Sequence, residues 1–404
     1  MSGAERITFA ATTLFLFVAP FASSGGIRAG CLIAAALALA ATRPWARMQR
    51  LPVALCATFG AWCLLSLASA AWSEAPQRTW EELRAETFYS ALAFAVFLLA
   101  AQVTWWRAWG IAALASTLLA FVAQGLQQAT GIALWRHPPD GGVGPFSTQL
   151  VLVAPLLVAL ASPAPWGWTR GGWRTAALSI GLVIIAAWFT RDGWATPNRI
   201  VWPALLAVLA VAVLAARRAT GVRIADRGLA WTSAIGAAVM VAAFVGAVAL
   251  KSERFYPGDA GITASVEHDL RPRLWSVAFR EWKSAPWIGH GLGREIREPA
   301  FLPETPPQPG YPPLRHAHNM LLNIAVQLGA LGVAIFAAIV ILLAREYAGY
   351  VGASSIAPLG VIGLALLAGF LVKNLTDDFL HRHNAQMFWA LNGMLVGLGS
   401  RARR

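Results

Sequence analysis

Apolar runs long enough to cross a lipid bilayer recur along almost the whole chain, and they restrict its fold more than any other feature. A transmembrane helix needs about 20 consecutive apolar residues. The candidate spans are approximately 7–23, 29–43, 52–72, 86–103, 108–126, 146–162, 175–190, 199–216, 229–250, 317–344, 354–373 and 383–400. We therefore predict an all-α, polytopic membrane protein with about twelve transmembrane helices.

Composition supports this prediction and excludes several other classes of protein. Hydrophobic residues make up 57% of the chain and charged residues 13%, against about 45–50% and about 25% in soluble domains. A disordered, collagen-like or soluble multidomain protein does not fit these values. The cysteines, Cys31, Cys56 and Cys63, are scattered through apolar runs. That placement is typical of small core residues and not of a disulfide framework or a metal site.

The distribution of basic residues predicts the orientation of the chain. The formal net charge is +13, but a nucleic-acid partner is not expected because most arginines lie in short loops between apolar runs. If the N-terminus is cytoplasmic, the basic loops and tail follow the even-numbered spans, and the loops after odd-numbered spans are mixed or acidic, as in 73–87. The positive-inside rule therefore predicts that both termini are cytoplasmic, with the first span kept uncleaved.

The spans divide the chain into three parts. Residues 1–250 form a nine-span N-terminal membrane region, 251–316 a large periplasmic loop, and 317–404 a three-span C-terminal membrane region. A loop of this length in a compact protein is usually functional. Within it, 266–283 has apolar residues at helical spacing, at Leu270, Leu274, Val277, Ala278 and Trp282. We predict a short helix there, lying against the membrane surface.

The sequence His316-Ala317-His318-Asn319 at the start of the tenth span is the sharpest chemical feature. On a continuous helix, Gly329 and Gly332 fall on the face of His318, which would place that histidine at the outer end of a closely packed seam. His316, two positions away, would point to the opposite side and could not share a metal with it. A neutral histidine suits proton abstraction from a hydroxyl, whereas the alternative is an interfacial histidine that only caps the helix.

Three motifs together resemble a known family. The pattern His-Asn-x9-Gly-x2-Gly follows Arg271-Pro272-Arg273-Leu274-Trp275 and then the run from Pro286 to Gly293, all after a long loop late in a twelve-span chain. This arrangement is similar to the O-antigen ligases, whose superfamily includes O-antigen polymerases and O-oligosaccharyltransferases. The resemblance implies a glycosyltransferase C-like membrane fold in the bacterial inner membrane.

The resemblance also implies a reaction and the residues that carry it. Such a ligase moves a glycan from undecaprenyl pyrophosphate to a sugar hydroxyl of lipid A-core at the periplasmic face, without a metal or another cofactor. His318 is then the general base, and Arg271 and Arg199 stabilise the pyrophosphate. Further substrate-binding candidates are Arg273 and Arg191, as alternatives to those arginines, and His316 and Asn319.

Two interpretations of neighbouring residues stay open. Gly289 and Gly291 are compatible with a nest of amide groups for a phosphate, or with a plain turn. Asp377, Asp378, His381 and His383 are compatible with a divalent cation site, although the resemblance implies none.

Other functions also stay open. The first alternative is an O-antigen polymerase, which differs from the ligase in its acceptor, or an O-oligosaccharyltransferase. A secondary transporter is a more distant alternative, because the predicted spans contain almost no acidic residues and the polar residues collect outside them.

Overall fold

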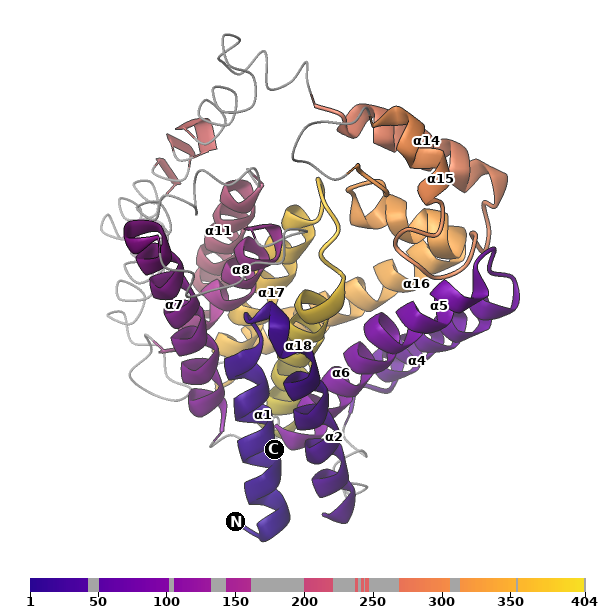
Figure 1. The fold of residues 1–404 in the computed structure, drawn as a ribbon. Coiled ribbons are helices and arrows are strands. Elements are labelled where there is room, and N and C mark those ends of the chain that lie inside the picture. Colours follow the sequence, from indigo (N-terminus) through magenta and orange to yellow (C-terminus); the bar gives the residue numbers. More distant parts are fainter. Residues whose placement is uncertain are drawn as a thin grey trace.

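The chain is seen in a computed structural model that describes residues 1–42, 51–101, 105–131, 143–160, 200–220, 269–305, 313–353 and 355–402, with a few residues between 237 and 246. All the regular structure in these ranges is helical (Figure 1). The principal helices are α1 (Gly3–Val18), α2 (Gly25–Ala41), α4 (Val53–Ala68), α5 (Pro76–Glu82), α6 (Tyr89–Ala100), α7 (Trp106–Thr130), α8 (Val143–Leu160), α11 (Val201–Thr220), α14 (Arg271–Ser284), α15 (Glu298–Phe301), α16 (Met320–Val351), α17 (Ala357–Lys373) and α18 (Arg382–Ala402).

All but two of the predicted spans coincide with helices. The span 175–190 lies outside the described residues, and 229–250 is described only in short helical fragments. By length and apolar composition, four helical segments in the described part of the chain can cross a membrane: Val53–Ala71, Pro76–Ala100, Val201–Ala219 and Met320–Val351. The all-helical membrane class is therefore supported, while twelve crossings remains a prediction.

Helices distant in sequence pack closely through small residues. Gly393 and Gly397 of α18 press against the backbone carbonyls of Phe94 and Leu98 in α6, so that a side chain at either glycine would overlap the neighbouring helix. Close approach of this kind is how small residues join helices in membranes. Both termini lie at one end of the bundle, and α14 and α15 lie at the other (Figure 1).

The acidic segment 73–87, predicted as a loop, is mostly helical. Pro76 stands at the first turn of α5, where its missing N–H removes no helical bond. After α5 the backbone widens into one stretch of π-helix, Leu83–Phe88, and then continues as α6. A π-segment inside a helix is frequently associated with a functional site, and this one carries Glu86.

The predicted helix at 266–283 is confirmed over Arg271–Ser284, although its apolar stripe does not face the membrane alone. Leu274, Val277 and Ala278 are fully buried and pack against Val326 at the start of α16. The apolar face of α14 that we expected to lie on the membrane is therefore largely buried inside the protein.

Charged side chains hold the segment after α14 in place. Arg297 pairs with Glu281 of α14 and with Glu74 from the turn before α5. His290 contacts the same Glu74 carboxylate through Nδ1, and its Nε2 lies 2.9 Å from the carbonyl oxygen of Glu281. The network joins segments that are more than 200 positions apart in sequence.

The helix α16 is broken at Gly329, where the backbone adopts φ 64° and ψ −165°. The loop that follows α14 enters this break. The N–H groups of His290 and Gly291 donate to the carbonyls of Val326 and Gln327, at 3.0 Å each. On the other side, the N–H groups of Ala330 and Leu331 donate to the carbonyls of Pro286 and Trp287, at 2.8 and 3.1 Å. The loop thus replaces the hydrogen bonds that a continuous helix would make.

Glycine is required on both sides of this junction. A Cβ atom at Gly329 would overlap the backbone of Trp287, and one at Gly289, whose φ is 66°, would overlap the backbone of Gln327. The sequence predicted that Gly329 allows another helix to approach closely. The close neighbour is instead a loop, and the glycine also supplies a backbone conformation that L-residues rarely adopt.

We predict that Gly329→Ala destabilises the protein by about 3 kcal/mol or more, because it combines an unfavourable backbone conformation with a steric overlap. The measurement is thermal unfolding of the purified protein in detergent. Gly60→Ala in α4 is the matched control, since a Cβ there meets open space and a helical Gly→Ala change gains about 0.5–1 kcal/mol. Equal melting temperatures for the two variants would contradict the role of the junction.

Candidate functional site

His318 does not lie on α16. It precedes the helix, with a left-handed φ of 48°, and Asn319 is the N-cap. The prediction that His318 shares a helix face with Gly329 and Gly332 is therefore wrong, because it assumed a helix continuous from His316 onward. The helix begins only after Asn319, because the Asn319 side chain caps it: Oδ1 accepts from the N–H of Leu322 at 3.1 Å.

A carboxylate orients the His318 ring. Nδ1 of His318 lies 3.0 Å from Oδ1 of Asp377, and the ring is about one-fifth exposed. Because a carboxylate only accepts hydrogen bonds, Nδ1 is the donor and Nε2 carries the free lone pair when the ring is neutral. Burial raises the pKa of Asp377, but His318, Arg294 and Lys373 together hold it well below its usual range. The carboxylate therefore stays ionised beside the imidazole.

His316 stacks on His318 and does not point to the opposite side as predicted. Their ring centroids are 4.0 Å apart and the planes differ by 26°. The N–H of His318 donates to Nδ1 of His316 at 3.1 Å, which places the His316 proton on Nε2 in its neutral form. Burial, and then the positive charge of Arg294, lower the pKa of His316 well below its ordinary value. We therefore assign His316 as a neutral support for the His318 backbone.

The buried side chain of Asn323 connects the two halves of the site, and the sequence analysis did not identify it. Its Oδ1 accepts from the N–H of Ala317 at 3.0 Å, and its Nδ2 donates to Oδ2 of Asp378 at 2.7 Å. The same Nδ2 lies 3.3 Å from Nδ1 of His316. A polar side chain one turn after Asn319 in an apolar helix was the available signal.

Of the four arginines predicted to bind the pyrophosphate, only Arg271 is seen beside the dyad of His318 and Asp377 in the described residues. Its Nε donates to the carbonyl of Thr376 at 2.9 Å, and the guanidinium pairs with Asp269 at 3.0 Å. Arg273 is exposed on α14. Arg199 and Arg191 lie outside the described residues, so their predicted roles stay predictions.

Two basic residues near the dyad were not among the predicted site residues. Arg294 NH2 lies 3.6 Å from Oδ1 of Asp377. Lys373 is fully buried at the end of α17, with its ammonium 3.9 Å from the centre of the Phe379 ring. Arg294 directly follows the run from Pro286 to Gly293, which was the available signal, whereas Lys373 has no such motif beside it.

The predicted phosphate nest is not formed, because its amide groups bond to the protein. The N–H of Gly289 donates to the Ala285 carbonyl, and that of Gly291 to Gln327. Asn319, also predicted to bind substrate, uses Oδ1 for the helix cap and Nδ2 for the Leu375 carbonyl. We therefore assign structural roles to these residues.

Two clusters in the described part of the chain bring metal-ligand types together. The first is His316, His318 and Asp377 and the second is Glu82, Glu86 and His381, with ligand atoms within 4.8 Å of one another in each. In the first cluster the rings are stacked, so their in-plane lone pairs run side by side and do not converge on one ion. Of the predicted cation ligands, Asp378 bonds to Asn323 and caps the N–H of Leu380.

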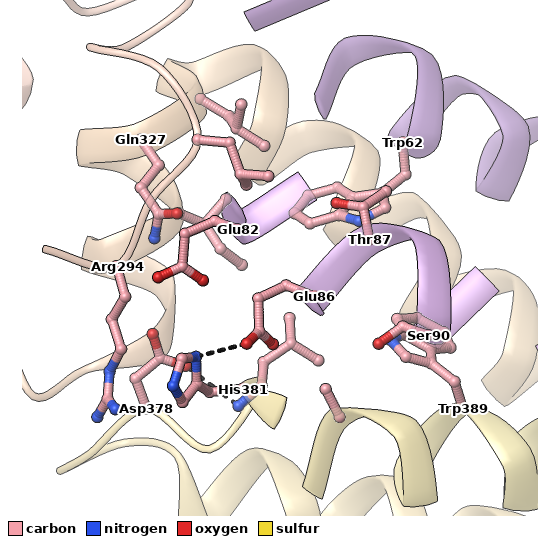
Figure 2. A pocket seen from close by; sticks show the side chains of 15 residues that line it. Trp62, Glu82, Glu86, Thr87, Ser90, Arg294, Gln327, Asp378, His381 and Trp389 are labelled. Atoms are coloured by element: carbon pink, nitrogen blue, oxygen red, sulfur yellow. Dashed lines mark hydrogen bonds and ion pairs between the residues drawn. The ribbon is translucent and has the colours of Figure 1, made fainter. Parts of the chain in front are cut away.

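A pocket opens beside the dyad (Figure 2). Arg294 and Asp378 line one side of it, and Glu82, Glu86 and Ser90 project from the helix that runs from α5 into α6. His381 joins the two sides, since its Nδ1 lies 2.9 Å from Oε1 of Glu86.

We predict that lowering the pH from 7.5 to 5.5 destabilises the wild type more than a His316→Asn variant. The folded-state pKa of His316 is depressed below the unfolded value of 6.5, so the unfolded chain binds the proton first. The resulting stability is present at pH 7.5 and is lost as the pH falls through 6.5, by at most about 1.4 kcal/mol at pH 5.5.

Melting temperatures at the two pH values measure this difference. The carboxylate of Asp377 does not interfere, because its contribution is lost only below its unfolded pKa of 3.8. Asparagine at position 316 can still accept the His318 N–H. Parallel loss of stability in both proteins would show that the His316 ring is protonated in the folded state.

Comparison with known proteins identifies one family. Residues 150–337 match the family described as O-Antigen ligase. The matched segment includes His318 and Arg271, and it ends before Asp377. Among curated individual proteins, the comparison finds no match. The resemblance predicted from the sequence is thereby confirmed, and the chain carries, over residues 150–337, the domain of the O-antigen ligase family.

Proposed function

We propose that this protein is an O-antigen ligase that transfers a glycan from undecaprenyl pyrophosphate to a sugar hydroxyl of lipid A-core, at the periplasmic face of the bacterial inner membrane. The family match supports a ligase or polymerase type of function. The observation that carries the proposal further is the pairing of His318 with Asp377, because a base oriented by a carboxylate is the device that activates a hydroxyl.

We infer the following steps for this reaction. The acceptor hydroxyl gives its proton to Nε2 of His318 while its oxygen attacks the anomeric carbon of the donor glycan. The bond between that carbon and the pyrophosphate oxygen breaks, and the pyrophosphate leaves with the electron pair. The ionised Asp377 stabilises the imidazolium that forms. No metal is required in this proposal, because arginines offset the charge of the leaving group.

We propose Arg271 for that task, on the strength of the sequence resemblance and of its contact with Thr376, the residue before Asp377. Its Nε donates to the carbonyl of Thr376. A guanidinium can bind two phosphate oxygens at once. The ion pair of Arg271 with Asp269 is partly exposed, so a pyrophosphate can compete for it. Arg199 is proposed as a second contact on the strength of the sequence resemblance.

We expect His318→Ala and Asp377→Asn to lower ligation by about 10²–10⁴-fold, while leaving the protein inserted in the membrane. Lipopolysaccharide from a ligase-deficient strain carrying each variant is analysed on gels, with equal expression confirmed by immunoblot. The wild type should restore the long-chain ladder. If the wild type restores chain length only in a polymerase-deficient strain, the protein is a polymerase. Wild-type ladders from both variants would remove the dyad from catalysis.

Arg271→Ala should reduce the transfer rate by about 30–1000-fold, because one charge-assisted contact with the leaving group is worth about 2–4 kcal/mol. Lysine at this position should rescue poorly, since it lacks the guanidinium fork. Rates are measured with purified protein in proteoliposomes. Arg280→Ala is the matched control, because Arg280 is exposed on the same helix. Equal rates for the two alanine variants would exclude Arg271 from the site.

A further inference from the structure

The pocket beside the dyad has a mixed lining that the proposed mechanism does not use. Glu82 and Glu86 supply acceptors on one side, and Arg294 supplies a donor on the other (Figure 2). Trp62 and Trp389 add aromatic surface. Acceptors, donors and aromatic faces in one small cavity match a neutral ligand that carries several hydroxyl groups.

Unsatisfied polar atoms point to a ligand in this pocket. Ser90 is 4% exposed, and its Oγ has no hydrogen-bond partner among the described residues. The Nε of Arg294 is likewise buried without a partner in that part of the chain. Buried polar groups are seldom left without a hydrogen bond. We therefore expect a bound molecule in the cavity to supply a hydrogen-bond partner to each of these two atoms.

Two residues that line the pocket, Arg294 and Asp378, link it to the dyad of His318 and Asp377. Arg294 lines the pocket and also lies 3.6 Å from Asp377, which orients His318. Asp378, the next residue, forms part of the same wall. A group held here is therefore adjacent to the hydroxyl or the anomeric carbon that reacts at His318.

We propose that this pocket binds the hydroxyl-bearing edge of one sugar ring, in the donor glycan or in the acceptor, and so selects the sugar presented to His318. The inference rests on the proposed glycan transfer. The cavity volume is about 50 Å³, several times the ~10–15 Å³ that one water needs on this measure. That space suits two or three hydroxyl groups of a ring edge, with the rest of the ring outside.

A divalent cation is the competing occupant, because Glu82, Glu86 and His381 bring three ligand types together. Arg294 lines the same cavity, and a positive charge beside a cation site is unfavourable. Ser90 and the tryptophans also have no function in such a site. The mixed lining thus favours the sugar.

The test uses two variants, Glu82→Gln and Ser90→Ala, in proteoliposomes with undecaprenyl pyrophosphate-linked glycan as donor and lipid A-core as acceptor. Removing a hydrogen bond to a charged group should raise KM by about 10–100-fold in Glu82→Gln, and loss of the hydroxyl by about 3–10-fold in Ser90→Ala. The KM increase should affect one substrate only, which identifies the sugar in the pocket, and kcat should change little. Glu81→Gln is the matched control, since Glu81 is exposed beside Glu82.

Other outcomes overturn the proposal. Unchanged KM values in both variants, or a fall in kcat with KM unchanged, would show that the pocket does not bind a substrate sugar. A KM increase produced equally by EDTA in the wild type, and reversed by Mn²⁺, would assign the pocket to a cation. If the wild type transfers no glycan, the proposed function itself fails and this inference fails with it. An active wild type with unaffected variants refutes the pocket alone.

Discussion

The helix α16 does not complete its own hydrogen-bond ladder, and the placement of the candidate site depends on how that gap is filled. The break at Gly329 frees two carbonyls before it and two amide groups after it, and the loop from Pro286 to Gly291 satisfies all four. An unsatisfied backbone group in an apolar environment costs several kcal/mol, so the loop and the helix must fold together. The junction therefore fixes the segment that leads to Arg294 relative to α16, the helix that Asn319 caps.

The dyad depends on a second set of contacts, which centre on a single amide. Asn323 accepts a hydrogen bond from the backbone before His318 and donates one to the carboxylate of Asp378. It thereby joins the turn that precedes α16 to the turn that follows α17. His318 adopts a left-handed backbone conformation, which persists only where the surroundings restrain it. The strained residue and its restraints together orient the imidazole toward Asp377.

Several features of the protein could be predicted from the sequence because they depend on local patterns. Apolar runs of about 20 residues predicted most of the helices, since a helix is the local solution for a chain in lipid. Helical spacing predicted α14, and the motif around His318 predicted both the family and the region of the site. Errors arose where a contact overrides a local pattern: α16 starts after His318 because Asn319 caps it, and the glycines near Gly291 pack on α16 and so present no free amide groups to a phosphate.

The sequence by itself determined the all-helical class and the family and singled out His318 as a candidate, because hydropathy and a spaced motif can be read along one dimension. Only the tertiary structure decided the partners of that histidine. Asp377 lies 59 positions away, Arg294 comes from the loop after α14, and Asn323 near the start of α16 binds Asp378 from the same distant turn. No periodicity records such pairings, because they arise when a broken helix, a loop and a distant turn satisfy each other's hydrogen bonds in three dimensions.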